Sequence, residues 1–167
     1  MSETAAVSIQ NVTKNFGGLV AVDQMNFDVR EHKVFGIIGP NGSGKTTMLN
    51  LISGMLKRSS GRVELYGKDI SGSSANRIAC HGVARTFQLV RTLPTMTVTE
   101  NIAAGGVFGY RRYWKEELDR RVNYMVSQVG LSGKEMMPVG ALTYIDQKRV
   151  ELARALMSDP KLLLLDE

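Results

Sequence analysis

Two segments near the N-terminus alternate apolar and polar residues, Val7 to Phe16 and Ala21 to Val29. Gly17 and Gly18 lie between them and favour a tight turn. This pattern predicts an antiparallel hairpin with one buried face. The run from Val34 to Ile38 is instead continuously apolar and stands between charged residues and a glycine-rich stretch, which predicts a buried parallel strand.

Signals for helices and strands alternate over the following residues. The segment Lys45 to Leu56 predicts a helix that ends at two basic residues and a Ser-Ser-Gly turn. Short runs predict strands at Arg62 to Tyr66 and at Val83 to Phe87, with a short helix at Arg77 to Cys80 between them. Four consecutive leucines, Leu162 to Leu165, predict a second buried strand near the end of the chain. The chain is therefore a mixed α/β protein.

Between Leu89 and Ala141 the pattern becomes helical, which predicts a helical insert. Helices are expected at Val98 to Val107 and Trp114 to Val129, and a third follows at Thr143 to Met157. The last two are separated by residues that break helices: Gly130, Gly133 and Pro138.

Composition excludes several classes of protein. With 167 residues and 43% hydrophobic residues, the chain has the size and apolar content of one globular domain. Its net charge is +5, but the adjacent arginines at 111–112 and 120–121 are interleaved with acidic residues, as on a solvated helix face. The one cysteine, Cys80, cannot form an internal disulfide. No apolar run approaches the roughly 18 residues of a membrane span, and the N-terminus does not read as a secretory signal, so we expect a cytoplasmic protein.

The glycine-rich stretch carries the strongest chemical signal. Residues Gly39 to Thr46 fit the pattern G-x-x-x-x-G-K-[ST], between a predicted strand and a predicted helix, which is the context that a phosphate-binding loop requires. Glycines let the backbone amides converge on an anion, and the start of the helix adds about half a positive charge. Lys45 is expected to reach the β- and γ-phosphates of a nucleotide, and the Thr46 hydroxyl to bind Mg²⁺.

Two carboxylates follow the four leucines. Asp166 stands where the strand beside a phosphate loop presents an acidic side chain toward Mg²⁺. Glu167 comes next and could accept a hydrogen bond from an attacking water. Alone, these residues could equally be the ordinary acidic end of a strand, and it is the upstream loop that favours the catalytic interpretation.

Four motifs in this order resemble the ATP-binding subunits of ABC transporters, above all those of branched-chain amino-acid importers. They are GPNGSGKTT at 39–47, Gln88 within ARTFQ, LTYIDQKRVELARAL at 142–156, and LLLLDE at 162–167. The resemblance implies a P-loop NTPase (RecA-like) core with an antiparallel β-subdomain and a helical subdomain, truncated after the Walker B strand. Residues 1–167 would form a single incomplete domain, with 1–88 and 142–167 in the core and β-subdomain, and 89–141 in the helical subdomain.

The resemblance also implies roles for particular residues. Phe16 would stack on adenine, although it could instead be an edge-strand core residue, and Val22 would line the same face. Thr143 would contact the γ-phosphate of ATP held by a second ATPase subunit. The implied catalytic residues are Glu167, Lys45 and Gln88, and the implied Mg²⁺ ligands are Thr46, Gln88 and Asp166. The remaining nucleotide-binding residues are Gly39, Pro40, Asn41, Gly42, Ser43, Gly44, Lys45, Thr46 and Thr47.

Two departures from the family pattern bear on this activity. Ile145 replaces a glycine of the signature motif, and its branched side chain should resist positive φ and crowd the approach to phosphate. The chain also lacks the family's later histidine-bearing strand, which suggests a fragment.

The resemblance implies an ATPase that couples hydrolysis to solute import, on the cytoplasmic face of the membrane. Its partners would be permease subunits and a second ATPase subunit, with ATP and Mg²⁺ as cofactors and no nucleic acid. Two alternatives stay open: a soluble ABC ATPase acting on nucleic acid or ribosomes, and a nucleotide-binding subunit that does not hydrolyse ATP.

Overall fold

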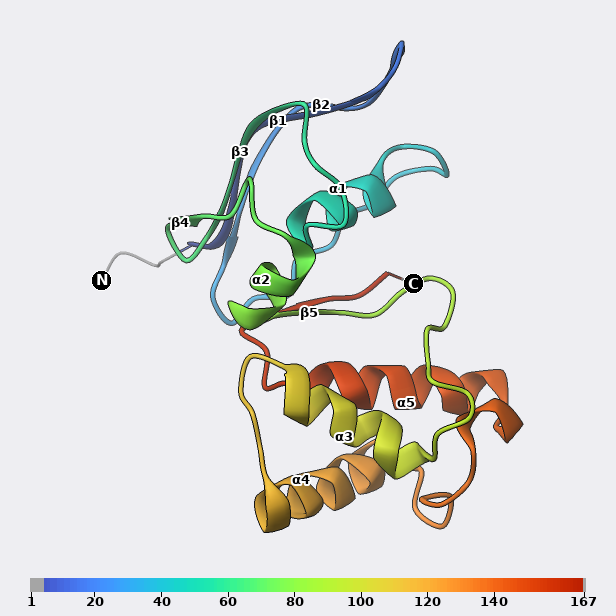
Figure 1. The fold of residues 1–167 in the computed structure, drawn as a ribbon. Coiled ribbons are helices and arrows are strands. Elements are labelled where there is room, and N and C mark those ends of the chain that lie inside the picture. The colour runs from blue at the N-terminus through green and yellow to red at the C-terminus, as the bar shows by residue number, and fades with distance from the viewer. Residues whose placement is uncertain (1–4, 167) are drawn as a thin grey trace. The chain divides into compact units, whose positions relative to one another are not determined.

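The structure of the protein is a computed structural model that describes residues 5–166. The chain divides into two compact units, Met1–Ile78 and Ala79–Glu167, and the elements of each are seen in Figure 1. Each unit is described by itself.

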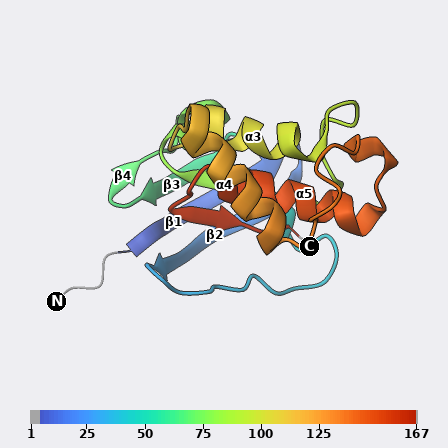
Figure 2. The same ribbon diagram turned by 90° about the horizontal axis from the view of Figure 1, so that it is seen from below.

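The first unit contains a four-stranded antiparallel sheet. Its strands are β1 (Ala5–Phe16), β2 (Leu19–Arg30), β3 (Ser60–Leu65) and β4 (Lys68–Asp69), in the spatial order β2-β1-β3-β4 (Figure 2). The predicted hairpin is confirmed, because β1 and β2 pair antiparallel from Ala5 opposite Arg30 to Phe16 opposite Leu19. Strands β1 and β3 supply the buried face, where the alternation of β1 shifts by one residue at an irregularity between Ile9 and Val12: Val7, Ile9, Val12, Val63 and Leu65.

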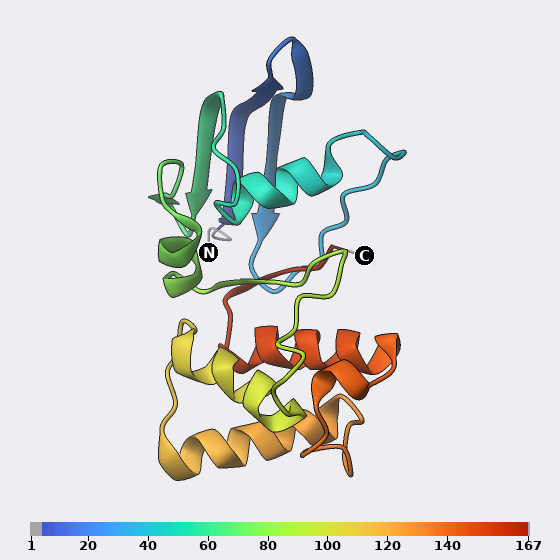
Figure 3. The same cartoon turned by 45° about the vertical axis from the view of Figure 1, so that its right-hand side comes forward.

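Helix α1 (Lys45–Ile52) lies across one face of this sheet and buries Met48, Leu51 and Ile52 (Figure 3). It is four residues shorter than the sequence predicts. The helix ends at Ser53 because Gly54 follows with φ +71°, the left-handed conformation that commonly terminates helices. The short helix α2 (Ala75–Cys80) begins two residues earlier than predicted.

The predicted buried strand at Val34 to Ile38 is wrong in this structure. No strand forms over 33–40, and both Val34 and Ile38 are exposed. A parallel strand exists only where neighbouring strands complete its hydrogen-bond ladder, and this segment pairs with neither edge of the first unit's sheet. Its one ring contact among the described residues is Phe35, which stacks on Phe27 of β2 with 5.1 Å between ring centroids.

The second unit combines a parallel strand pair with helices. Strands β5 (Val83–Arg85) and β6 (Leu162–Leu164) lie within the two segments predicted to be strands, and they pair in parallel. The helices are α3 (Val98–Phe108), α4 (Lys115–Gln128), the 3₁₀ turn η1 (Val139–Ala141) and α5 (Tyr144–Met157). The three predicted helices are confirmed to within one residue at each end.

Helices α3, α4 and α5 enclose one hydrophobic core, and Figure 1 shows α3 beside both of the others. At Gly105 an added Cβ would lie 2.0 Å from the carbonyl oxygen of Arg154, so glycine permits the close approach of α3 and α5. The buried core residues are Val98, Ile102, Tyr113, Val122, Val126, Leu131, Val139, Leu142, Val150, Ala153 and Met157.

Candidate nucleotide-binding site

The loop before α1 has the backbone geometry that the motif requires. Gly42 and Gly44 adopt φ +82° and +90°, and the Ser43 N–H donates to the Pro40 carbonyl at 3.2 Å. Gly44 is the N-cap of α1, and a Cβ there would lie 2.4 Å from the Ala21 carbonyl oxygen of β2. The loop therefore turns into the helix directly against the hairpin, at a point where only glycine fits.

The beginning of α1 suits an anion. No side chain caps it and its first turn holds no acidic residue, so its backbone partial charge is not neutralised by the protein's own carboxylates. Lys45, the first residue of the helix, donates from Nζ to the carbonyl oxygens of Gly39 at 2.8 Å and Pro40 at 2.9 Å. The ammonium group thus closes the loop on itself. These residues fit a phosphate group, because amides, helix terminus and cation belong to one short segment.

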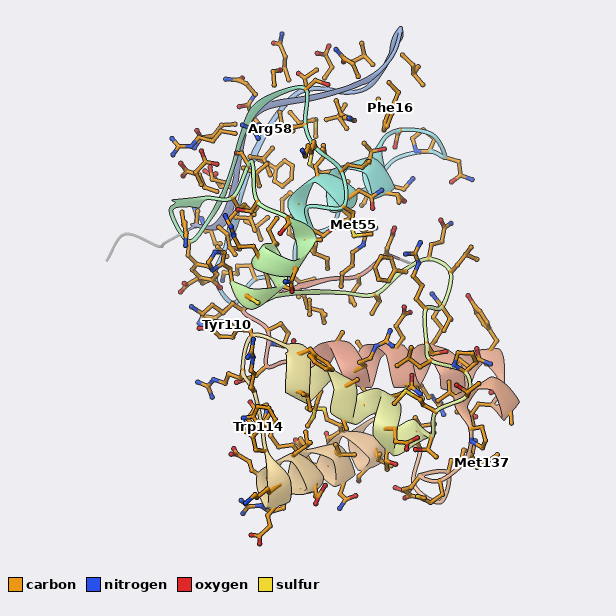
Figure 4. All side chains as sticks on the ribbon, in the orientation of Figure 1. Phe16, Met55, Arg58, Tyr110, Trp114 and Met137 are labelled. Carbon is orange, nitrogen blue, oxygen red and sulfur yellow. The ribbon has the colours of Figure 1, made fainter. Side chains whose placement is uncertain are left out.

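The other predicted residues of the first unit lie on the loop, α1 and the hairpin. Thr46 and Thr47 are the second and third residues of α1, and Thr46 is exposed. Val22 is buried in β2, with its Cγ2 3.3 Å from the position of an added Gly44 Cβ, so it contacts the loop side of the hairpin. Phe16 ends β1 and is 46% exposed, which does not support a core role. Figure 4 shows it at that end of the hairpin.

Asp166 follows β6 and is buried in an ion pair. Its Oδ2 lies 2.8 Å from an Arg85 guanidinium nitrogen, and both side chains are less than a tenth exposed. Parallel pairing of β5 with β6 places Arg85 opposite Leu164, which brings the two charged groups to the same end of the strand pair. Sequence reasoning missed Arg85. The sequence does carry one signal that could have identified Arg85: it is a charged residue within a predicted strand, three residues before Gln88. Glu167 lies outside the described residues.

Gln88 is exposed and lies in the connection from β5 to α3, three residues after the end of β5. Its carbonyl oxygen accepts hydrogen bonds from Lys148 Nζ at 3.0 Å and from the Tyr144 hydroxyl at 3.4 Å. Both donors are on α5. The second unit therefore brings the segment of Gln88 and the signature helix together.

The signature residues form the start of α5. The Thr143 hydroxyl caps the helix by accepting the Asp146 N–H at 3.2 Å. Ile145 lies in the first turn, 66% exposed, and is not among the residues with positive φ, so the expected conflict with positive φ is wrong. Asp146 is buried against Lys134 at 2.6 Å and Arg149 at 3.1 Å, and the hydrogen bond from Lys134 is the main reason that its pKa lies below the ordinary value.

Within residues 5–166, no cluster of three or more His, Cys, Asp or Glu side chains could hold a metal ion. Nor does that part of the chain contain a helix long and apolar enough to cross a membrane. The predicted Mg²⁺ ligands are Thr46, Gln88 and Asp166, of which only one is among these four residue types, so the first finding does not test that site.

A glycine-rich loop that turns into an uncapped helix, with a lysine at the first helical position, defines a P-loop nucleotide-binding protein. The comparisons identify the family within this class. The sequence profile described as ABC transporter matches residues 22–167. The chain belongs to the ATP-binding subunits of ABC transporters, which bind and hydrolyse ATP.

Three relatives show the breadth of the similarity. The high-affinity branched-chain amino acid transport ATP-binding protein BraF of Pseudomonas aeruginosa is 35% identical, over 96% of this chain and 68% of that protein. The spermidine/putrescine import ATP-binding protein PotA of Rubrobacter xylanophilus is 41% identical, over 97% of this chain and 42% of that protein. A crystallised ATP-binding cassette of an ABC transporter superimposes with a TM-score of 0.87 at 34% identity, covering all of this chain and 70% of that one.

Proposed function

We propose that this chain binds Mg-ATP and couples its hydrolysis to the import of branched-chain amino acids. The observation that carries nucleotide binding is the loop of residues 39–44, where two glycines at positive φ and an uncapped helix terminus form a site for phosphate. The similarity to BraF, whose name states branched-chain amino acid transport, supports the substrate class.

Each proposed site residue has a definite task. Loop amides and Lys45 would hold the β- and γ-phosphates, and Thr46 and Asp166 would bind the Mg²⁺ that neutralises charge developing on them. Gln88 would contact Mg²⁺ or the water, and Glu167 would orient the water. Thr143 would reach the γ-phosphate held by a second ATPase subunit. Phe16 and Val22 would contact the adenine.

Lys45 must change partners when phosphate binds. Its present acceptors, the Gly39 and Pro40 carbonyls, are neutral, whereas phosphate oxygens are charged and form stronger hydrogen bonds. The exchange favours nucleotide because the ammonium group then pairs with an acceptor of opposite charge. The two contacts of Lys45 within the loop support this proposal, because they hold its ammonium group at the loop that would bind phosphate.

The other proposed partners, a permease and a second ATPase subunit, are those that the resemblance to ABC transporters implies. Residues 1–88 and 142–167 would form the nucleotide-binding core and β-subdomain. Residues 89–141 would dock on a permease at the cytoplasmic face of the membrane, and a second ATPase subunit would complete the site. That permease would carry the solute across the membrane.

The nucleotide-binding part is tested by calorimetry on Lys45→Ala, with Lys57→Ala as the matched control. Lys57 is an exposed lysine beyond the end of α1. Removing charge-assisted bonds to phosphate costs about 1.5 to 3 kcal/mol, so the Kd for ATP should rise about 10- to 150-fold in Lys45→Ala and stay unchanged in Lys57→Ala. Equal affinity of wild type and Lys45→Ala would exclude the loop as the phosphate site.

The substrate is tested by uptake into proteoliposomes that contain the ATPase, the permease encoded with it and the cognate binding protein. ATP-dependent uptake of leucine, but not of spermidine, is expected. The spermidine arm is needed because the polyamine transport relative PotA is also similar to this chain. Uptake of spermidine without leucine would refute the proposed substrate and leave the ATPase assignment intact.

A further inference from the structure

Helix α5 holds the main chain of the segment around Gln88. Lys148 Nζ donates to two consecutive carbonyl oxygens, Phe87 at 2.9 Å and Gln88 at 3.0 Å. One amine thereby fixes both peptide groups that flank the α-carbon of Gln88. The direction in which the Gln88 side chain leaves the backbone depends on these two peptides.

Three residues further along α5, Glu151 makes a second attachment. Its side chain is 1% exposed, and Oε1 accepts the backbone N–H of Arg91 at 3.1 Å. The guanidinium of Arg154 donates to the carbonyl oxygen of the same Arg91. Both backbone polar groups of Arg91 are therefore bound by side chains of α5.

A buried carboxylate in this place is costly. Oε2 of Glu151 is buried and makes no hydrogen bond within residues 5–166, and an unsatisfied buried oxygen destabilises a fold. Arg154 supplies a compensating charge: burial lowers the pKa of its guanidinium, and the Glu151 carboxylate offsets part of that shift. An apolar residue would pack here at lower cost, so the bond to Arg91 is the feature that distinguishes Glu151 from such a residue.

Side chains of the segment add a further constraint. The Phe87 ring lies between two guanidinium groups, Arg85 with 5.0 Å and Arg91 with 4.6 Å to the ring centroid. Arg85 is also the ion-pair partner of Asp166. The segment 85–91 is thus held at its start by β6, in the middle by stacking, and along its main chain by α5.

We infer that Lys148 and Glu151 are positioning residues that fix the main chain on both sides of Gln88 and so set where its carboxamide is presented. This inference rests on the proposed role of Gln88 in hydrolysis. Neither residue touches the reacting atoms. Their effect on turnover passes through Gln88, and a shift of α5 carries the Gln88 segment with it.

The test compares Glu151→Ala with Glu151→Gln, and uses exposed Glu116→Ala of α4 as the control. Gln retains an acceptor for the Arg91 N–H, whereas Ala removes it. Amide hydrogen exchange at Arg91, followed by NMR, should be about tenfold faster or more in Glu151→Ala and near wild type in Glu151→Gln and Glu116→Ala. Unchanged exchange at Arg91 in Glu151→Ala would overturn the attachment.

Turnover supplies the second readout. Phosphate release by Glu151→Ala should show kcat reduced about tenfold with KM for Mg-ATP unchanged, and Glu151→Gln should restore kcat. In a Gln88→Ala background, Glu151→Ala should have no further effect, since it acts through Gln88. Additive losses would show a merely structural role and overturn the inference.

Two further results separate the inference from its premise. If Gln88→Ala alone leaves kcat unchanged, the proposed role of Gln88 fails, and the exchange measurement still decides whether Glu151 holds Arg91. If Glu151→Ala does not fold, Lys148→Met carries the same kcat test at a less buried position. Wild-type kcat in Lys148→Met would then overturn the inference.

Discussion

Replacing Gly44 with alanine should damage the phosphate loop far more than the same change at Gly42. Both residues are held at positive φ, +90° and +82°, which costs an L-residue about 1–2 kcal/mol. They differ in their surroundings. An added Cβ at Gly44 would lie 2.4 Å from the Ala21 carbonyl oxygen, whereas an added Cβ at Gly42 would have no described residue within 4 Å apart from its two chain neighbours.

The two costs can be estimated separately. Gly42→Ala is destabilised only by the φ strain. Alanine also restricts the unfolded chain, which offsets about 0.4–1 kcal/mol of that strain, so the free energy of unfolding should fall by about 1 kcal/mol. Gly44→Ala adds the displacement of a backbone carbonyl. Ala21 lies between Val20 and Val22, which pair with Asn15 and Lys14 of β1, so the carbonyl cannot retreat without disturbing the hairpin. Overpacking of this kind adds about 1–3 kcal/mol, for a total of about 2–4 kcal/mol.

The measurement is urea unfolding of wild type and both variants, with Gly36→Ala as a baseline. Gly36 has no positive φ and open space around its Cα, so its replacement should change stability by less than about 0.5 kcal/mol. Equal losses for Gly42→Ala and Gly44→Ala, at equal m-values, would refute the claim that contact with the hairpin sets the glycine requirement.

Three further outcomes are expected. Lys134→Met should raise the pKa of Asp146, because that pKa lies below its ordinary value mainly through the Lys134 hydrogen bond. The ionised carboxylate stabilises the fold fully above its unfolded pKa of about 3.9, and this stabilisation is lost as pH falls through the folded pKa. An NMR titration should therefore show Asp146 taking up its proton at a higher pH in the variant than in wild type. Leu131→Ala should lower the free energy of unfolding by about 2–5 kcal/mol, whereas Phe108→Ala, at an exposed position, should change it by less than about 0.5 kcal/mol. In the proposed dimer with a second ATPase subunit, Ile145→Gly should raise phosphate release while lowering stability by less than about 1 kcal/mol, as thermal unfolding would show.

Elements with strong periodicity were predictable from the sequence. The hairpin and the three helices of the second unit follow the spacing of their apolar residues, which reports burial directly. The end of α1 was missed because Leu56 continues the apolar pattern, while the stop comes from the backbone of Gly54. The strand predicted at Val34 to Ile38 was wrong for a different reason. Apolar residues indicate a preference for burial, but a strand also needs a neighbouring strand for its hydrogen bonds, and the pattern does not identify one.

In the candidate site, too, some features could be predicted from the sequence and others could not. The phosphate loop was predictable because its glycines and lysine act through local backbone geometry. The partners of Asp166 and of Arg91 were not, since Arg85 and Glu151 are charged residues that any periodicity argument assigns to the surface, whereas the structure buries both. The burial of a charged side chain can be predicted only when the group that compensates its charge is known, and here that group is distant in sequence.

Lys45 and Asp166, which the motifs assign to phosphate and Mg²⁺, already have partners, and the two exchanges differ in kind. Lys45 would give up two bonds from its charged ammonium group to neutral carbonyls for bonds to phosphate oxygens, which are stronger because both partners are ionised. Asp166 would share or lose a buried ion pair with Arg85, which leaves a guanidinium charge to be compensated. The exchange at Lys45 would therefore favour phosphate. Engagement of Asp166 would call for a divalent cation, because a cation of greater charge than Arg85 would compete better for the carboxylate.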